Sequence, residues 1–260
     1  MENDCAKNHS PFLFYLCLNR QMKLPLFYKP DISLNDEKVM LDEPASKHII
    51  QVLRMHSGEQ LQLTDGKGNL FTVQIKDDNR KKCLVTIIQT SEIQHSKSNI
   101  IIAISPVKNN SRFEWFLEKA TEIGVAQIVP LICERTEKQH FKYDRMNSIL
   151  VSAMLQSQQV WLPKLQEPKK FTEYIKNIKD NAAIQKFIAH CQDETSKVQL
   201  STQLINRSNN QLILIGPEGD FTKTEIETAL NNNFTAVALG NTRLRTETAG
   251  IVAASLLCNI

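Results

Sequence analysis

The sequence lacks the cysteine spacings that bind metals or cross-link small secreted domains. Its six cysteines lie far apart, and no two of them have C-x-x-C spacing. A zinc site is therefore not expected, and a chain of 260 residues can bury a core without disulfides. We expect reduced thiols, no bound metal and a cytoplasmic protein.

Long hydrophobic runs are also missing. The run Phe12–Leu18 is short, whereas a transmembrane helix needs about 20 apolar residues. The preceding Met1–Asp4 is acidic, whereas a signal peptide begins with basic residues. We expect no membrane association and interpret residues 1–21 as a disordered or wrongly assigned extension, with secretion as the alternative.

The chain has no strong excess of either charge. Its formal net charge is +3, which is a weak argument for nucleic-acid binding. Any surface that binds RNA must therefore arise from local clusters of basic residues.

Glycine-rich phosphate loops are absent. Leu212–Ile215 is a short apolar run typical of a covered parallel strand, and Gly216-Pro217-Glu218-Gly219 follows it. Neither Gly-Lys-Ser/Thr nor G-x-G-x-x-G occurs in this loop, so a phosphate cradle is not favoured. A loop at the carboxyl end of a strand can instead hold a cofactor through backbone groups.

A helix is predicted directly after this loop. Thr222 and Glu225 have the spacing of a capping box, and Phe221 with Ile226 fits a hydrophobic staple. The helix start is thereby specified to within about two residues.

A second strand, loop and helix follow at Val237–Gly240, Asn241–Arg245 and from Thr246 onward. The final helix is rich in small residues. Gly250 costs roughly 1 kcal/mol relative to alanine within a helix. We therefore expect another backbone to pack closely against Gly250.

Residues 22–93 are predicted to be rich in short strands, with one helical segment at Ser46–Met55. Apolar and polar residues alternate on either side of a glycine-containing turn, which favours a small barrel over an open sheet. The predicted strands and turn cover residues 61–63, 65–69, 71–75 and 84–88.

After a polar linker at Glu92–Asn99, the pattern becomes strand, helix, strand, which indicates a parallel sheet. The two strands are Ile100–Ser105 and Gln127–Ile132. A second capping box is predicted at Ser111 and Glu114. The helix would bury an apolar face and end at a glycine, as indicated by Phe113, Phe116, Leu117, Ala120 and Gly124.

Further along, Asp144 is predicted to cap another helix. Ala182–Ala189 is predicted to be a strand and Asp193–Gln199 a loop. The apolar face of the helix suits the core or a dimer contact better than a cofactor site, and consists of Met146, Ile149, Leu150, Ala153, Met154 and Trp161.

Together, these motifs resemble the RsmE family of ribosomal RNA uridine-N3 methyltransferases, which belong to the SPOUT methyltransferases. The resemblance rests on Gly216–Gly219, Leu239-Gly240 and Leu244–Ala249, and extends over residues 22–260. It implies an α/β fold in which a PUA-like, OB-like RNA-binding β-barrel at 22–93 precedes a SPOUT-type (α/β knot) methyltransferase domain with a parallel sheet at 97–260.

The resemblance implies methyl transfer from S-adenosylmethionine to N3 of a uridine in 16S ribosomal RNA, on the assembled small ribosomal subunit. It also implies a homodimer with the site at the interface. Two alternatives stay open, namely a ribose 2′-O-methyltransferase of the same fold and a non-catalytic RNA-binding assembly factor.

Arg245 is the residue expected to stabilise the uracil anion, because a guanidinium offers fixed donors and keeps its charge. Glu218 and Glu247 are candidates to orient the loop or a proton, and all three catalytic candidates have purely structural alternatives. The cofactor-binding residues implied by the resemblance are Leu214, Gly216, Pro217, Glu218, Gly219, Leu239, Gly240, Leu244, Arg245, Thr246 and Ala249.

Basic residues in both parts are candidates for RNA contact, with an ordinary solvated surface as the alternative for each. Glu118 and Glu122, one helical turn apart, are interpreted as a solvent-exposed face, with an acid/base pair as the alternative. Two positions depart from the family: Asp220 replaces a usual glycine, and Gln159 lies where a basic residue is common. The RNA-binding candidates are Lys47, His48, Arg54, Lys67, Arg80, Lys81, Lys82, Lys108, Arg112 and Arg135.

Overall fold

The computed structural model describes residues 24–94, 99–137, 141–178, 181, 183–192, 196–204 and 209–258. The expectation for residues 1–21 lies outside these ranges. No helix within them is both long and apolar enough to cross a membrane. The chain forms two compact units. One comprises the described residues up to Leu63 together with 71–90, and the other comprises 64–70 together with the described residues from 91 onward.

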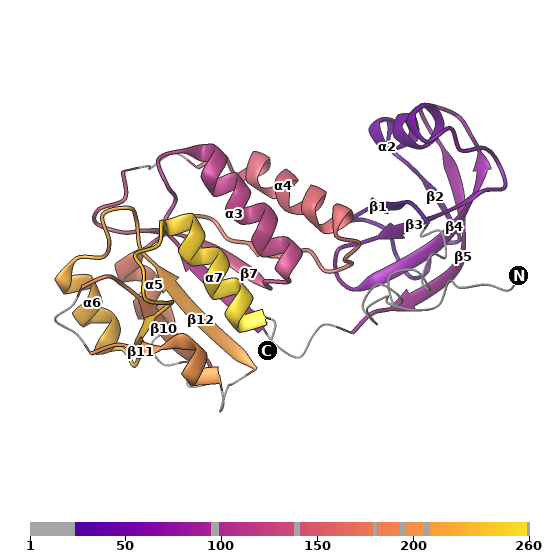
Figure 1. Cartoon of the computed structure of the whole chain (residues 1–260). Helices are drawn as coiled ribbons and strands as arrows, with labels where there is room; N and C mark the ends of the chain where they lie inside the picture. Colours follow the sequence, from indigo (N-terminus) through magenta and orange to yellow (C-terminus); the bar gives the residue numbers. More distant parts are fainter. Residues whose placement is uncertain are drawn as a thin grey trace, which may run out of the picture. The chain divides into compact units, whose positions relative to one another are not determined.

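The first unit is a curled five-stranded sheet that forms a half-barrel (Figure 1). Alternating side chains of two strands, from Leu61 to Ile75, fill its core, as the sequence pattern predicts. The predicted helical segment is a short helix, α2 (Glu43–Lys47), continued by a π-helical turn, η1 (His48–Val52). In the order β1-β3-β4-β5-β2, the strands are β1 (Leu26–Tyr28), β3 (Gln60–Thr64), β4 (Asn69–Asp77), β5 (Leu84–Glu92) and β2 (Lys38–Met40).

The second unit is built on a parallel sheet in which neighbouring strands run in the same direction. Its order is β11-β13-β10-β12-β6-β7-β8, with β9 paired to β7. The strands are β6 (Asn99–Ile104), β7 (Gln127–Ile132), β8 (Lys164–Leu165), β9 (Lys169–Lys170), β10 (Gln185–Ala189), β11 (Val198–Gln199), β12 (Asn210–Ile215) and β13 (Thr235–Ala238).

Helices cover both faces of this sheet (Figure 1). One face packs against α3 (Asn110–Ile123), α4 (Tyr143–Gln156) and α7 (Thr246–Cys258). The other face packs against α5 (Phe171–Ile178) and α6 (Lys223–Leu230). A short 3₁₀ helix, η2 (Leu200–Leu204), follows β11.

The apolar runs of the central strands supply both cores. In β12, Ile213 and Ile215 belong to the core under α3, α4 and α7, whereas Leu212 and Leu214 belong to the core under α5 and α6. A strand covered on both faces has no solvent-facing positions, so its sequence is continuously apolar.

The capping box that starts α6 is confirmed. The Thr222 hydroxyl accepts from the Glu225 N–H, and the Glu225 carboxylate accepts from the Thr222 N–H. Phe221 and Ile226 are buried in one cluster, as a hydrophobic staple requires. Glu225 also accepts a hydrogen bond from the Glu134 N–H at 2.9 Å, so this carboxylate fixes the loop after β7 as well.

The predicted caps of two other helices are wrong. Asn109, not Ser111, caps α3, because the Asn109 side chain accepts from the Ser111 N–H. Glu114 instead binds Arg145. In α4 the N-cap is Lys142, with no side-chain hydrogen bond, and Asp144 lies in the first turn. The predicted end of α3 at Gly124 is confirmed, with φ 98°.

Gln159 closes the carboxyl end of α3. Its amide donates to the carbonyls of Thr121 and Glu122 at 3.0 and 2.9 Å. These carbonyls lie in the last turn of the helix, where the regular partner four residues later is missing, and the Thr121 carbonyl also accepts from the Gly124 N–H at 3.0 Å. The side chain that replaces a basic residue therefore has a structural role here. Lys119 lies between Glu118 and Glu122 and binds both.

Two further expectations about the second unit need correction. Trp161 lies beyond the end of α4, where it donates to the Ile93 carbonyl at 2.9 Å and covers Gly68 of the turn 64–70. The segment predicted to be a loop at 193–199 contains β11 at its end. Its two residues pair with β13, and periodicity cannot detect so short a strand.

Gly250 is a point of close packing in α7, and the three atoms nearest to a Cβ atom built there belong to side chains, where the sequence predicts another backbone. A Cβ atom at this position would lie 2.6 Å from the Phe116 ring and 2.8 Å from Ile104 Cδ1. Both neighbours are fully buried, so the ring and the methyl group have little room to move.

We expect Gly250→Ala to destabilise the protein. The overpacking costs about 1–3 kcal/mol, which exceeds the roughly 1 kcal/mol gained in helix propensity. Urea unfolding followed by circular dichroism measures the change. Ser255→Ala, at an exposed position of the same helix, is the matched control and should change stability little. Equal stability of the Gly250→Ala variant and the wild type would contradict the packing account.

Candidate active site

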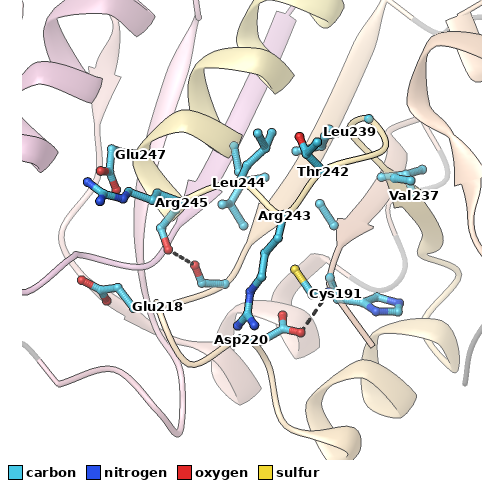
Figure 2. Close-up of a pocket in the computed structure, with 18 of the residues that line it drawn as sticks. Cys191, Glu218, Asp220, Val237, Leu239, Thr242, Arg243, Leu244, Arg245 and Glu247 are labelled. Atoms are coloured by element: carbon cyan, nitrogen blue, oxygen red, sulfur yellow. Dashed lines mark hydrogen bonds between the residues drawn. The ribbon is translucent and has the colours of Figure 1, made fainter. Parts of the chain in front are cut away.

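A cavity of about 780 Å³ lies at the carboxyl ends of β10, β12 and β13. This is the edge of a parallel sheet at which α/β proteins bind ligands. Figure 2 shows part of its lining. The lining residues come from the β10 end (Ala189, His190, Cys191), the β12 end (Ile215–Glu218, Asp220), the segment Val237–Glu247, and Arg112, Lys197 and Ala249.

The loop after β12 depends on Gly216. A Cβ atom there would lie 3.0 Å from the Phe221 ring, which belongs to the same turn. The glycine therefore lets the chain turn tightly over a buried aromatic side chain.

One hydrogen bond joins the two motif loops. The Thr246 hydroxyl donates to the Gly216 carbonyl at 3.0 Å, and Thr246 is buried. The Ala249 N–H donates to the Arg245 carbonyl at 2.7 Å, so the backbone of Arg245 is fixed at the start of α7. Its exposed side chain is thus presented from a rigid support.

Glu247 is buried, with a side chain only 6% exposed, and it faces Arg112 on α3. The Arg112 Nε lies 3.7 Å from Glu247 Oε1. The carboxylate also lies in the first turn of α7, where the helix dipole favours a negative charge. Glu247 thereby holds Arg112 at the cavity.

Glu218 links its loop to the segment after β6. Its Oε1 accepts from the Lys108 N–H at 3.0 Å. Arg135 reaches the same loop and donates from Nη1 to the Gly219 carbonyl at 2.8 Å. The Lys108 side chain pairs with Glu137 at 3.1 Å. Three of the basic residues proposed for RNA contact, Lys108, Arg112 and Arg135, therefore surround the motif loops.

Asp220 occupies the left-handed region, with φ 62°, which is costly for most residues other than glycine. One carboxylate oxygen accepts from the Cys191 N–H at 2.9 Å (Figure 2). The other accepts from the Phe221 N–H at 2.9 Å. Arg243 extends toward Asp220 from the opposite loop (Figure 2). The carboxylate therefore connects the ends of β12 and β10, which glycine cannot do.

His190 contributes to the cavity directly after β10. The residue is 7% exposed, and neither ring nitrogen has a hydrogen-bond partner among the described residues. Burial lowers the pKa of its imidazole below the usual value, and the Lys197 charge lowers it further, while Asp220 raises it. His190 is therefore expected to be neutral at physiological pH.

Most of the residues implied for the cofactor lie together in this cavity. Leu214 and Gly219 are the exceptions. Leu214 is fully buried in the core under α5 and α6, and Gly219 lies against Arg135. The residues brought together are Gly216, Pro217, Glu218, Leu239, Gly240, Leu244, Arg245, Thr246 and Ala249.

Sequence reasoning missed the contribution of β10. Ala189, His190 and Cys191 follow an apolar run that was predicted to be a strand, so their place at its carboxyl end was the available signal. Nothing in the sequence pattern indicates that β10 lies between β12 and β13. Arg243 and Lys197 carried no comparable signal.

The remaining RNA-binding candidates are not among the residues that line this cavity. They are exposed, and Lys47 pairs with Glu43 at 2.7 Å. Arg54 has the left-handed φ of 57°. The His48 ring stacks edge-on against Phe27. In addition to these three, the group comprises Lys67, Arg80, Lys81 and Lys82.

The sequence matches two protein-family descriptions. Residues 94–258 match the RNA methyltransferase domain, and residues 41–88 match the RNA methyltransferase PUA domain. The parallel sheet with helices on both faces and the half-barrel are the structures of these two regions. The fold and site thus define an RNA methyltransferase with a SPOUT domain.

Named relatives define the group more narrowly. Ribosomal RNA small subunit methyltransferase E of Synechocystis is 30% identical over 80% of this chain and 69% of its own length. The structure of a probable rRNA-methyltransferase from Porphyromonas gingivalis is 39% identical, with a TM-score of 0.81 over 89% of this chain and 95% of that one. The structure of ribosomal RNA small subunit methyltransferase E from Neisseria gonorrhoeae, bound to S-adenosylmethionine, is 28% identical, with a TM-score of 0.78 over 89% of this chain and 95% of that one. The chain belongs to the RsmE family.

Two substitutions at Asp220 distinguish the stability gained from its hydrogen bonds from the stability lost through its left-handed backbone conformation. We expect Asp220→Ala to lower the free energy of unfolding by about 2 kcal/mol, since two hydrogen bonds worth about 1 kcal/mol each are lost. Asp220→Gly loses the same bonds but relieves roughly 1 kcal/mol of left-handed strain, so it should be intermediate. Urea denaturation measures both.

Asn233→Gly provides the matched control. Asn233 is also left-handed, with φ 65°, and exposed, so glycine there should be neutral or stabilising. If Asp220→Gly were as stable as Asn233→Gly, the carboxylate would not connect the two strand ends.

Proposed function

We propose that this protein transfers a methyl group from S-adenosylmethionine to N3 of a specific uridine in 16S ribosomal RNA, on the assembled small subunit. The observation that carries this proposal is the cavity built by the two motif loops and joined by the hydrogen bond from Thr246 to Gly216. Membership of the RsmE family and a relative that holds S-adenosylmethionine support it.

The residues present fit this cofactor. The cavity has the size of a small-molecule site, and Leu239, Gly240 and Leu244, from the segment after β13, line it. His190 also brings ring nitrogens without partners among the described residues. Gly216, Leu239, Gly240, Leu244 and Thr246 would hold the cofactor, which supplies an electrophilic methyl group when bound.

The acceptor side of the site must deal with the proton on uracil N3. That nitrogen becomes a nucleophile only when its proton leaves, so a base must remove the proton or a cation must stabilise the resulting anion. Arg245 is proposed for the second role, because its backbone is fixed by α7 and its guanidinium is exposed. Methyl transfer also requires alignment of the uracil and exclusion of water.

The two carboxylates receive different proposed roles. Glu247 positions Arg112, since it is buried and faces that side chain. Glu218 holds the motif loop through the Lys108 N–H and keeps an exposed side chain. Glu218 is therefore the better candidate to touch the substrate or its proton.

We propose that residues 22–93 bind RNA and residues 97–260 catalyse the reaction, in the cytoplasm where ribosomes assemble. N3 lies on the Watson–Crick edge of the base, so the target uridine must be unpaired or extruded. Lys108, Arg112 and Arg135 supply positive charge beside the motif loops. The basic residues of the first unit would contact phosphates of the RNA.

Methyl transfer to small ribosomal subunits that lack the modification tests the function. Labelled S-adenosylmethionine and wild-type protein should yield N3-methyluridine, identified by mass spectrometry of the nucleosides. Naked RNA is assayed in parallel. A ribose-methylated product would instead establish the alternative reaction. Cofactor binding without any product would favour a different substrate, and no cofactor binding would favour the assembly-factor alternative.

We expect Arg245→Ala to lower kcat by roughly 100-fold or more, the loss typical of removing one donor to a developing anion. Binding of S-adenosylmethionine, measured by calorimetry, should change much less. Lys176→Ala, at an exposed cation on α5, is the control and should retain full activity. A kcat near the wild-type value for Arg245→Ala would assign Arg245 a structural role.

We also propose a homodimer in which a second copy completes each site. Trp115, on α3 beside Arg112, is 46% exposed, which suits a covered interface. Sedimentation equilibrium should give twice the mass of the chain at micromolar concentrations. Trp115→Glu should shift the protein to monomer and lower activity, whereas Lys176→Glu should do neither. A wild-type monomer with full activity would exclude the dimer.

A further inference from the structure

We propose that the His190 imidazole, in its neutral form, contacts S-adenosylmethionine by accepting a hydrogen bond from a donor group of the cofactor. The proposal rests on the cofactor assignment above and deepens it, because it adds a residue of β10 that neither sequence motif contains. The donor is an N–H or O–H group of the cofactor, and the experiments below distinguish its adenosine part from its amino-acid part.

The hydrogen-bonding capacity of the His190 ring is unmet among the described residues. His190 is more than nine-tenths buried, and neither Nδ1 nor Nε2 has a partner among the described residues. Buried polar side-chain atoms in folded proteins are almost always paired. A buried ring with two unpaired nitrogens, in a residue that lines the cavity, therefore indicates a partner supplied by a ligand.

The position of His190 also favours contact with a ligand in the cavity. His190 directly follows β10, the strand between β12 and β13. The loops after those two strands carry the family motifs. The ring therefore lies in the wall that connects them, and a half-turn about its Cβ–Cγ bond exchanges the positions of nitrogen and carbon atoms. The ring can then offer a nitrogen to the cavity without displacement of the backbone.

Charged groups of both signs surround the His190 ring. Lys197 donates to the His190 carbonyl at 3.3 Å, and Asp220 faces the ring from the loop after β12. Arg243 extends toward Asp220 (Figure 2). Burial and Lys197 lower the pKa of His190, and Asp220 raises it. The other charged groups of the cavity are Arg112, Glu218, Arg245 and Glu247.

The consequence is a proton-linked affinity. A neutral imidazole has one acceptor nitrogen, and an imidazolium has none. Because the pKa of His190 is lowered, the neutral form is present above the usual histidine pKa and is lost only at more acidic pH. The dissociation constant should then rise as the pH falls below the pKa of the free protein, by at least the roughly three- to tenfold that one lost hydrogen bond accounts for. It should be constant above that pKa.

The test is calorimetric titration of the full chain with S-adenosylmethionine from pH 8 to pH 5. Wild-type affinity should fall at acidic pH. We call this fall in affinity at low pH the acidic limb. His190→Phe should bind roughly three- to tenfold more weakly at pH 8, as expected for one lost hydrogen bond. It should also lack the acidic limb. His190→Gln or His190→Asn, which keeps an acceptor that does not titrate, should retain affinity at both extremes. Ionisation of the cofactor itself would affect the wild type and these variants equally, so a difference between them reports on His190.

Two variants that change neighbouring charges test whether protonation of His190 causes the acidic limb. Asp220→Asn removes a charge that raises the pKa of His190, so the acidic limb should move to lower pH. Lys197→Met removes a charge that lowers it, so the limb should move to higher pH. A merely structural role for these residues would not produce opposite shifts. This arm also keeps the proposal testable if a His190 variant fails to fold.

Ligand fragments locate the donor. S-adenosylhomocysteine keeps every donor group of the cofactor and should show the same acidic limb. 5′-Methylthioadenosine lacks the amino-acid ammonium. A limb that persists with this fragment assigns the donor to the adenosine part, and a limb that disappears assigns it to the ammonium.

Two results would overturn the proposal. One is wild-type affinity that stays constant from pH 8 to pH 5 together with unchanged binding by His190→Phe. The other is tighter binding at acidic pH, which would make the ring a donor. A wild-type protein that binds no S-adenosylmethionine at any pH would instead refute the cofactor assignment, so the two failures are distinguishable.

Discussion

The central strand β12 determines where this protein can have a function. Helices cover both of its faces, and β10 and β6 pair with both of its edges. From Gln211 to Leu214 its side chains are fully buried. Its carboxyl end, from Ile215, lines the cavity, and the chain places Gly216 to Asp220 there. The continuous apolar character of the strand and the position of the site therefore have one physical cause.

Polar side-chain contacts join the loops at this edge. Thr246 joins the two motif loops, Glu218 reaches the segment after β6, Asp220 reaches the end of β10, and Glu225 reaches the loop after β7. Each contact connects segments that are distant in sequence. The cavity thus has walls fixed by side chains of its own loops, which is how a site is pre-organised for its ligand.

The sequence predicted the elements whose signals are local. The capping box at Thr222 and Glu225 depends on residues three apart, and the end of α3 depends on one glycine, so both were found. Asn109 was missed as a cap because Ser111 offered an equally plausible local pattern. The roles of Gln159 and Trp161 depend on partners far away in the chain, and the cavity wall at His190 depends on strand order. Periodicity contains no information of that kind.

The turn 64–70 has a consequence for how the chain can be divided. Its backbone belongs to the second unit: Gly68 donates to the Val160 carbonyl, and Leu162 donates to the Gly66 carbonyl. A Cβ atom at Gly68 would lie 2.3 Å from the Trp161 ring. The chain therefore passes from one unit to the other after residues 63, 70 and 90. A catalytic fragment beginning after the linker would lack this turn and leave Trp161 uncovered, so the two units are not separable modules even though they have separate cores.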